Sequence, residues 1–300
     1  MFPIAYHPIF RHPLPEGHRF PMLKYELLPQ QLLYEGTVSE TDFFSPESAR
    51  LDTVCNVHQK EYVDQLVNLT LEARAVRKIG FPLSAALVER ELRIAQGTIT
   101  GAEKALETGI AFNSAGGTHH AYSNHGEAFC LLNDQAIAAQ HLLNQQLAHK
   151  ILIVDLDVHQ GNGTAAIFLE NPNVFTFSVH GKTNYPFKKE TSDLDIALPD
   201  GTTDTEYLTI VSRVVPQLIA NEKPDFIFYL SGVDILASDK LGKLGCTIDG
   251  CRKRDEIVFS HCRAAGIPVQ CSMGGGYSPD IKTIIEAHAN TYRTASHIYS

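Results

Sequence analysis

The sequence predicts an α/β protein, a single domain of three layers in which a central, mostly parallel β-sheet is flanked by helices. Three observations predict this fold. The chain has 300 residues, 44% of them hydrophobic, which is enough for one large core. Short apolar runs of strand length are separated by longer stretches with helical spacing. Within those runs apolar and polar residues do not alternate, which is typical of parallel strands buried on both faces.

The elements follow one another in this alternating order. Apolar residues at helical spacing predict helices at 60–72, 83–108, 131–148, 204–220, 252–265 and 279–296. Unbroken apolar runs predict strands at 109–113, 151–155, 174–179, 226–230 and 267–271. The run at 151–155 (ILIVD) is rich in β-branched residues and leads into a turn that contains glycine. We find no repeat or linker, so residues 1–300 are predicted to form one domain.

The charge balance excludes several function classes. The chain has 25 basic and 34 acidic residues, a net charge of −9, which argues against binding nucleic acid or an anionic membrane through net charge. No apolar run approaches the roughly 18 residues of a membrane span, and the first residues lack the pattern of a signal peptide. The six cysteines show no C-x-x-C spacing and are expected to be reduced thiols. We therefore expect a cytoplasmic protein with neither a nucleic-acid nor a membrane partner.

Four predicted strands are followed by polar or glycine-rich clusters. These are GGTHH at 116–120, DLDVHQGNG at 155–163, SGVD at 231–234 and GGGY at 274–277. In open α/β sheets, ligands bind beyond the carboxyl ends of the strands. The fold is therefore expected to bring the four clusters to one rim, and this convergence predicts an active site.

Metal ligation is the first chemistry that these clusters indicate. Asp157 and His159 lie two residues apart after a strand, so their side chains point the same way and can share one ion. Asp234 is a candidate third ligand. An Asp–His–Asp set suits Zn²⁺, and also Fe²⁺, and leaves positions for water and substrate. An isolated Asp-x-His can instead cap a helix or close a turn, but the other three clusters favour the metal site.

The tandem histidines His119 and His120 are candidates for acid/base catalysis. The two glycines before them suggest close approach of the backbone to another group. One imidazole can accept a proton from metal-activated water, and the other can protonate a leaving amine. Asp155 is a candidate partner that raises the basicity of one histidine, and Asn162 is a candidate partner of the other. The alternatives are a surface pair of histidines and a structural carboxylate at the strand end.

Three aromatic residues are further candidates. Tyr277 follows three glycines, and its hydroxyl is placed to donate to the oxyanion that forms when water attacks a carbonyl. The alternative is a flexible turn with an exposed ring. By spacing alone, Phe129 and Tyr185 are interpreted as packing aromatics.

At these clusters the sequence resembles the zinc-dependent histone deacetylase family, which has the arginase-like α/β fold. The similarity covers nearly the whole chain in order, through GGTHHA (116–121), FCLLND (129–134), DLDVHQGNG (155–163), SGVDILASD (231–239) and GGGY (274–277). The opening segment 12–25, the GNG at 161–163 and KRDEIVF at 253–259 look most like the class IV branch and its bacterial relatives.

The resemblance implies a role for each candidate. The implied metal ligands are Asp157, His159 and Asp234. The implied catalytic groups are His119 with its partner Asp155, His120 with its partner Asn162, and Tyr277. The implied substrate-binding residues are Phe129, Tyr185 and Gly275. A structural K⁺ is implied at Asp155 and carbonyls near Asp157, His159 and Ser178, and Arg19 is implied to line an internal passage for product release.

Three residues depart from the class I pattern of the family. Asn162 replaces an aspartate, Gln160 replaces a histidine, and Thr118 precedes the tandem histidines. A neutral amide at position 162 makes His120 easier to keep unprotonated near neutral pH. We therefore expect His120 to act as the base and His119 to be cationic.

The expected activity is that of a zinc-dependent amidohydrolase. It would remove acyl groups, foremost acetyl, from N-ε-acyl-lysine in a peptide or protein, or from a small acylated amine. The alternative substrates are long-chain fatty-acyl lysines and acetylpolyamines. A ureohydrolase with two metal ions would need additional carboxylates beside Asp157, where the sequence has Gln160 and Asn162. A module that binds acyl-lysine without turnover is the non-enzymatic alternative.

Overall fold

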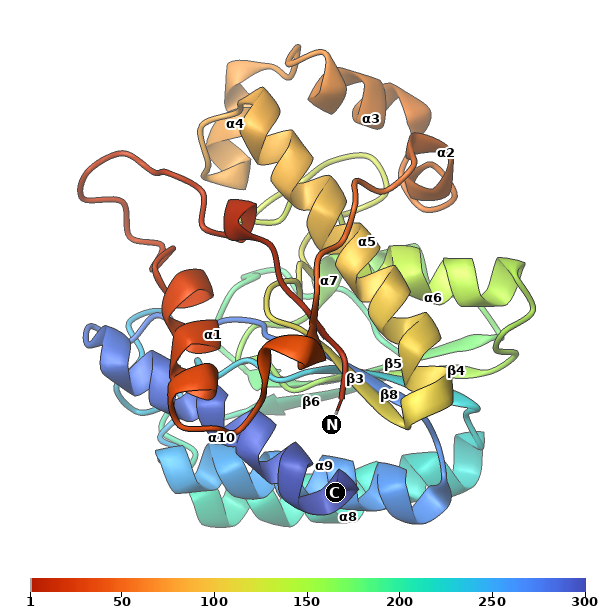
Figure 1. Cartoon of the computed structure of the whole chain (residues 1–300), viewed down its shortest axis with the longest axis vertical. Coiled ribbons are helices and arrows are strands. Elements are labelled where there is room, and N and C mark those ends of the chain that lie inside the picture. Colours follow the sequence, from red (N-terminus) through yellow and green to blue (C-terminus); the bar gives the residue numbers. More distant parts are fainter. Residues whose placement is uncertain (1) are drawn as a thin grey trace.

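In the computed structural model, which describes residues 2–300, a parallel sheet of eight strands lies at the centre (Figure 1). Its order is β2 (Phe43–Phe44), β1 (Ile4–Ala5), β3 (Ile110–Asn113), β8 (Val269–Ser272), β7 (Phe226–Leu230), β4 (Ile151–Asp155), β5 (Val174–Gly181) and β6 (Leu194–Leu198). Each neighbouring pair of strands is parallel. The predicted fold class is therefore confirmed.

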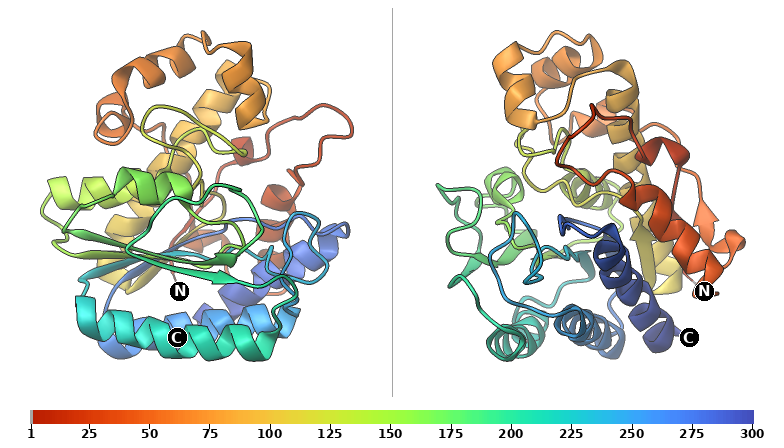
Figure 2. Two further views of the ribbon diagram at one scale, coloured as in Figure 1. Left: turned by 180° about the vertical axis from the view of Figure 1, so that it is seen from behind. Right: turned by 90° about the vertical axis from the view of Figure 1, so that its left-hand side faces the viewer.

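Helices cover both faces of this sheet (Figure 2). On one face α5 (Ala85–Thr108) packs against α6 (Asp134–Asn144). On the other face α8 (Asp204–Glu222), α9 (Ile248–Ala265) and α10 (Ile281–Tyr299) pack in series, and α1 (Lys24–Tyr34) packs against α10. The shorter helices are η1 (Pro8–Phe10), η2 (Glu40–Asp42), α2 (Leu51–Val54), α3 (Lys60–Val67), α4 (Ala73–Ile79) and α7 (Asn162–Ile167).

Local sequence explains where these elements lie. All of β4 and β7 is buried, as expected for parallel strands covered on both faces. Helix α5 begins where the Ser84 hydroxyl accepts the N–H of Leu87 at 3.1 Å. It ends at Gly109, whose φ of 82° is the left-handed conformation that glycine adopts without strain.

Some elements lacked a sequence signal. Strands β1 and β2 have two residues each, and the edge strand β6 is largely half-exposed, so none presents a continuous apolar run. Helix α1 contains Pro29 and lies in the proline-rich opening. The helix predicted at 60–72 ends at Val67, because Leu69 adopts a φ of 59° that breaks it, and α4 begins afterwards.

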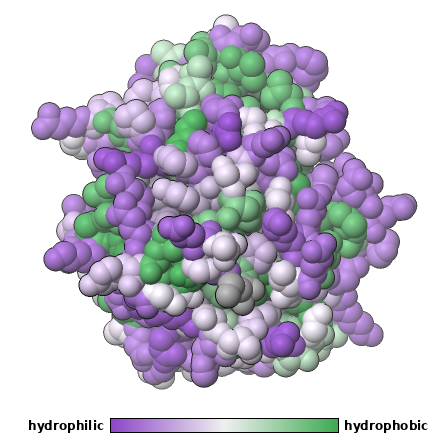
Figure 3. Space-filling model, viewed as in Figure 1, coloured by the Kyte–Doolittle hydropathy of each residue, from purple (hydrophilic) through white to green (hydrophobic). Residues whose placement is uncertain are grey.

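The surface of the protein is mostly polar on the face that Figure 3 shows. Apolar patches on this face are small and scattered. None of the helices within residues 2–300 is long and apolar enough to cross a membrane.

Candidate active site

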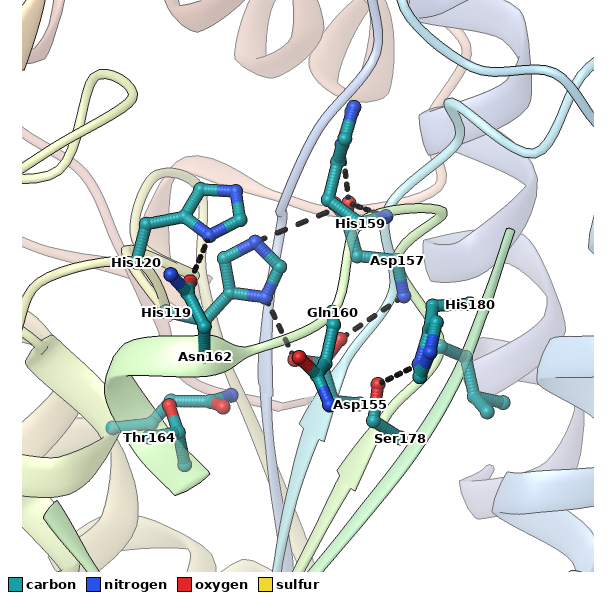
Figure 4. A network of polar contacts seen from close by, with 12 residues as sticks. His119, His120, Asp155, Asp157, His159, Gln160, Asn162, Thr164, Ser178 and His180 are labelled. Carbon is teal, nitrogen blue, oxygen red and sulfur yellow. Dashed lines mark hydrogen bonds and ion pairs between the residues drawn. The ribbon is translucent and has the colours of Figure 1, made fainter. Parts of the chain in front are cut away.

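The four clusters predicted from the sequence meet at one edge of the sheet. The strands that precede them are neighbours in the order β3, β8, β7, β4, and all are parallel. Their carboxyl ends therefore lie side by side, and the loops that follow them converge. Figure 4 shows the side chains of the loops after β3 and β4 pointing toward one another.

Asp157, His159 and Asp234 form the buried centre of this site. Nδ1 of His159 lies 3.0 Å from Oδ1 of Asp157 and 3.2 Å from Oδ2 of Asp234. Burial and the neighbouring Asp157 raise the pKa of Asp234 to about 7. Burial alone would lower the pKa of His159, but hydrogen bonds to the two carboxylates and their charges raise it to about 10. In the absence of a cation the two carboxylates thus favour a proton on His159, and a divalent cation held by the three side chains would take the place of that proton.

The geometry of these three side chains fits such a cation. Ligand atoms on a tetrahedral Zn²⁺ with bonds of about 2.0 Å lie about 3.3 Å apart. The two separations from His159 Nδ1 are close to this value, and all three side chains offer ligand atoms within 4.8 Å of one another. Nitrogen and oxygen donors also suit Zn²⁺ and Fe²⁺.

The ligand loops are held from two sides. The backbone N–H of Gly275 donates to Oδ2 of Asp157 at 2.8 Å, and a Cβ at Gly275 would lie only 1.9 Å from Oδ2 of Asp234. From beneath, the fully buried Arg254 of α9 donates to the carbonyls of Gly232 at 2.5 Å and Leu156 at 3.3 Å. One guanidinium therefore ties the loop that carries Asp157 to the loop that carries Asp234.

His119 is paired with a carboxylate. Its Nδ1 lies 2.7 Å from Oδ2 of Asp155, and both side chains are buried. Burial lowers the pKa of His119, but the charge and hydrogen bond of Asp155 outweigh burial and the net shift is upward. Asp155 itself is fixed by the backbone N–H of Asp157, which donates to its Oδ1 at 3.1 Å. His119 is therefore suited to hold a proton.

His120 is paired with an amide, and the network fixes which nitrogen carries its proton. Nδ2 of Asn162 donates to Oε1 of Glu127 at 2.7 Å and to the hydroxyl of Tyr122 at 3.0 Å. An ionised Glu127 accepts only, so Oδ1 of Asn162 must face Nδ1 of His120, which lies 2.6 Å away. Nδ1 is then the donor, and Nε2 keeps its lone pair.

The surroundings of His120 also keep it neutral. Burial lowers its pKa well below the usual value, and the charges of His119 and His159 lower it further. Glu127 remains a carboxylate despite burial, because hydrogen bonds from His125, Lys78 and others lower its pKa. The two adjacent imidazoles thus have opposite properties.

Tyr277 closes the site opposite His159, with ring centroids 6.3 Å apart. Burial raises the pKa of its hydroxyl well above the usual value, and the charges of Asp234 and Asp157 raise it further, so the hydroxyl remains a donor. The loop before it is held by Lys24, a fully buried residue whose Nζ donates to the carbonyl of Gly274 at 3.0 Å.

Two cavities that share lining residues lie beside these groups. An inner cavity of about 40 Å³ is lined by both tandem histidines, Gly275 and Tyr277, among others. An outer cavity of about 530 Å³ is lined by aromatic and aliphatic side chains that include Tyr185 and Leu241. Phe129 lines both cavities, and Tyr185 lines the outer cavity together with His120, His159 and Tyr277. The two aromatics that the resemblance implies to bind substrate therefore lie beside the candidate catalytic groups.

One prediction about this region was wrong. Arg19 was expected to line an internal passage, but its side chain is exposed at the outer cavity, with Cζ 5.0 Å from the centroid of the Phe129 ring. The arginine at the inner cavity is Arg90 of α5, which is 2% exposed and donates to the carbonyl of Phe10. The difference arises because the loop before α1 runs over the outside of the site.

Sequence reasoning missed three residues that support the site. Glu127, Lys24 and Arg254 are buried and charged, and each makes the contacts described above. A buried charge is not visible in a sequence before the fold is known. The only signal for Arg254 was its position in the KRDEIVF segment, and Glu127 lies just before FCLLND.

A second metal centre receives no support from the described part of the chain, in which the Asp–His–Asp cluster is the one group of metal-binding type found. Asp239 is an additional acid near Asp234, but its carboxylate accepts hydrogen bonds from the N–H groups of Leu241, Gly242 and Tyr277. The side-chain amide of Gln160 donates to the carbonyl of Glu190 and to the carboxylate of Asp195.

The resemblance also implies a structural K⁺. Asp155 on β4 and Ser178 on β5 are paired in register, so two of the expected ligands of this ion lie next to each other.

Comparison with known proteins gives a consistent result. The family model for the histone deacetylase domain matches residues 18–292. An uncharacterized protein of Picosynechococcus is 46% identical over 99% of both chains. Histone deacetylase 2 of Arabidopsis thaliana is 29% identical, and the match covers 89% of this chain and 72% of that protein. The acetoin utilization protein AcuC of Staphylococcus aureus is 27% identical, and the match covers 78% of this chain and 65% of that protein.

Solved structures show the same fold. The crystal structure of an HDAC homologue from Aquifex aeolicus has a TM-score of 0.85 at 21% identity, covering 99% of this chain and 84% of that one. The HD domain of HDA15 has a TM-score of 0.83 at 20% identity, covering 99% and 88%. An HDAC homologue with the same TM-score of 0.85 was solved in complex with SAHA.

Proposed function

The chain belongs to the histone deacetylase family of hydrolases, and from this premise we propose that it removes short acyl groups from N-ε-acyl-lysine in a Zn²⁺-dependent reaction. The observation that carries the proposal is the asymmetry of the tandem histidines. One is hydrogen-bonded to a carboxylate and the other to an amide, and both line the inner cavity above the ligand cluster.

Asp157, His159 and Asp234 would hold the metal ion. When bound, the ion supplies Lewis-acid polarisation of the acyl carbonyl and makes the attacking water more acidic. Nε2 of His120 takes the proton of that water, because its Nδ1 proton is held by Asn162 and its pKa is low. His119 gives its proton to the departing lysine amine, since Asp155 favours its cationic form.

The hydroxyl of Tyr277 donates a hydrogen bond to the oxyanion that develops on the acyl carbonyl. Its high pKa keeps the proton in place throughout the cycle. Lys24 and Gly275 keep its loop close to the ligands, through the carbonyl of Gly274 and the carboxylate of Asp157 respectively. Phe129 and Tyr185 would flank the aliphatic part of the lysine side chain, because both line the outer cavity.

The inner cavity favours a short acyl group. The volume open to the centre of a water-sized sphere is about 40 Å³ in this cavity. One water-sized group needs about 10–15 Å³ of such volume, so the cavity accommodates roughly three of them. An acetyl group fits this space, whereas a fatty-acyl chain of more than ten carbons would require its walls to move apart. This argues against the long-chain alternative.

The test compares acetyl-lysine and myristoyl-lysine peptides of one sequence with N-acetylspermidine, using the zinc-loaded protein. We expect kcat/KM for the acetyl peptide to exceed that for the myristoyl peptide by at least about tenfold. Even one or two methylene groups that a pocket cannot accept lower kcat/KM by about this factor. A faster myristoyl peptide would refute the short-acyl proposal. Zinc-loaded protein that binds acyl-lysine but turns over none of these substrates would support the binding-module alternative instead.

A further inference from the structure

The rim of the outer cavity has a charge opposite to that of the whole chain. The protein has a net charge of −9, yet the residues that line this cavity include Arg19, Lys78 and Lys243 and no acidic side chain. The three cations come from separate segments: the loop before α1, the end of α4, and the loop after β7. A basic rim on an acidic protein is a feature that attracts anionic groups to this cavity.

The cations differ in how far they are already neutralised. Lys78 is paired with the buried Glu127, so its charge is committed to the network of His120. Lys243 lies 3.8 Å from the half-exposed Asp200 and donates to the hydroxyl of Thr183 at 2.9 Å. Within residues 2–300, no ion pair joins Arg19 to a carboxylate, and its guanidinium lies over the ring of Phe129. The positive charge of Arg19 is therefore not balanced by an ion pair within the described residues.

The first part of the neighbouring loop between β5 and β6, residues 182–189, strengthens this field. Its sequence KTNYPFKK contains three lysines, and Lys182 and Lys188 are exposed. The two acids that follow in the loop, Glu190 and Asp193, accept hydrogen bonds from the hydroxyls of Tyr122 and Thr176. The same loop presents Phe187, which is 89% exposed and lies 6.3 Å from Tyr185 between ring centroids. An exposed aromatic beside a cavity, surrounded by cations, is typical of a surface that binds a peptide.

We propose that the preferred substrate is an acyl-lysine within an acidic segment of a polypeptide, rather than an acylpolyamine or an acyl-lysine in a basic tail. This inference rests on the proposed function. Carboxylates flanking the modified lysine would meet Arg19 and Lys243, and the adjacent main chain would lie against Phe187. An acylpolyamine keeps one or more ammonium groups, which would face the same cations without a carboxylate to balance them.

The experiment uses the zinc-loaded protein of residues 1–300 and peptides that differ only in the residues flanking a central acetyl-lysine. The flanks are Asp and Glu, Ser and Gly, or Lys, and capped acetyl-lysine and N-acetylspermidine complete the set. At low salt we expect the acidic peptide to exceed the basic peptide in kcat/KM by about threefold to tenfold, the size of one or two exposed ion pairs. The ratio should fall at high salt because these charges are exposed and screened.

Charge reversal tests the residues themselves. Arg19→Glu and Lys243→Glu, alone and together, should lower the acidic-to-basic ratio toward or below one. The matched control is Arg213→Glu, an exposed arginine in the middle of α8 and away from the cavity, which should leave the ratio unchanged. Two separate rim variants keep the test decisive if one of them folds poorly.

The outcomes separate a failure of this inference from a failure of the proposed deacylase function. Hydrolysis of capped acetyl-lysine with equal rates on acidic and basic peptides would overturn the inference and leave the deacylase function intact. Faster turnover of the basic peptide or of N-acetylspermidine would do the same. Absence of turnover on every substrate would overturn both.

Discussion

The substitution Asn162→Asp tests the division of labour between the tandem histidines. It places a carboxylate where the amide oxygen of Asn162 lies 2.6 Å from Nδ1 of His120. A carboxylate keeps the hydrogen bond and adds a negative charge, so it favours the imidazolium form and raises the pKa of His120. In the native protein, burial and the charges of His119 and His159 hold that pKa well below its usual value.

The structure sets the size of this effect. An opposite charge within hydrogen-bonding distance shifts a pKa by about 1–3 units. The new carboxylate would also lie beside Oε1 of Glu127, which is 2.7 Å from Nδ2 of Asn162, and repulsion between the two acids opposes full ionisation. The other groups that face His120 are the rings of His119, Tyr185 and His159, with centroids 4.1, 5.0 and 5.9 Å away. We therefore expect the lower end of the range, about one unit or 1.4 kcal/mol.

The sign of the shift follows from the proposed role of His120 as the base. Activity is lost as pH falls through the pKa of the base, so a higher pKa moves the acidic limb of kcat/KM to higher pH by about one unit. At a fixed pH below the limb, kcat/KM should fall about tenfold, and above it the change should be small. The assay is kcat/KM on an acetyl-lysine peptide with zinc-loaded protein, from about pH 5 to about pH 9.

The neutral variant Asn162→Ser is the control. It disturbs the hydrogen bond without adding charge, so it should lower the rate and leave the acidic limb in place. An acidic limb at the same pH in Asn162→Asp and the native enzyme would refute the assignment of His120 as the base.

Three other substitutions test the remaining parts of the site. Tyr277→Phe should lower kcat by about 10²–10³ with little change in KM, as steady-state kinetics would show, and a loss below about threefold would mean that its hydroxyl does not stabilise the oxyanion. Gly275→Ala should strongly reduce the amount of bound zinc measured by metal analysis, because the new Cβ would lie 1.9 Å from Oδ2 of Asp234. Full zinc occupancy in this variant would contradict the close approach of residue 275 to Asp234. Arg254→Lys should lower the melting temperature, and it should lower zinc affinity by about 10–100-fold in a chelator competition. The reason is that an ammonium group cannot bridge the two ligand loops as the guanidinium does. Unchanged zinc affinity would mean that Arg254 has a purely structural role.

The sequence predicted those features that depend on local pattern. The continuous run ILIVD gave β4 its bounds, and the polar clusters after the strands located the rim, because parallel strands end at the same edge. What it could not predict depends on tertiary contacts. Arg254 lies on a helix beneath the sheet, so nothing near it in the chain indicates that it reaches Leu156 and Gly232. Arg19 was misplaced for the same reason, since its position depends on how the opening loop crosses the finished fold.

Adjacent histidines are equivalent in the sequence, and their partners make them different. Asp155 comes from the end of β4 and presents a carboxylate to His119, whereas Asn162 begins α7 and presents an amide oxygen to His120. The amide is oriented because Glu127 and the hydroxyl of Tyr122 accept hydrogen bonds from its nitrogen. Glu127 stays ionised while buried because hydrogen bonds from His125 and Lys78, among others, lower its pKa. The proposed choice of base therefore depends on a chain of contacts that ends at the rim of the outer cavity. It follows that Lys78, although it touches neither histidine, helps to keep Nε2 of His120 free to accept a proton.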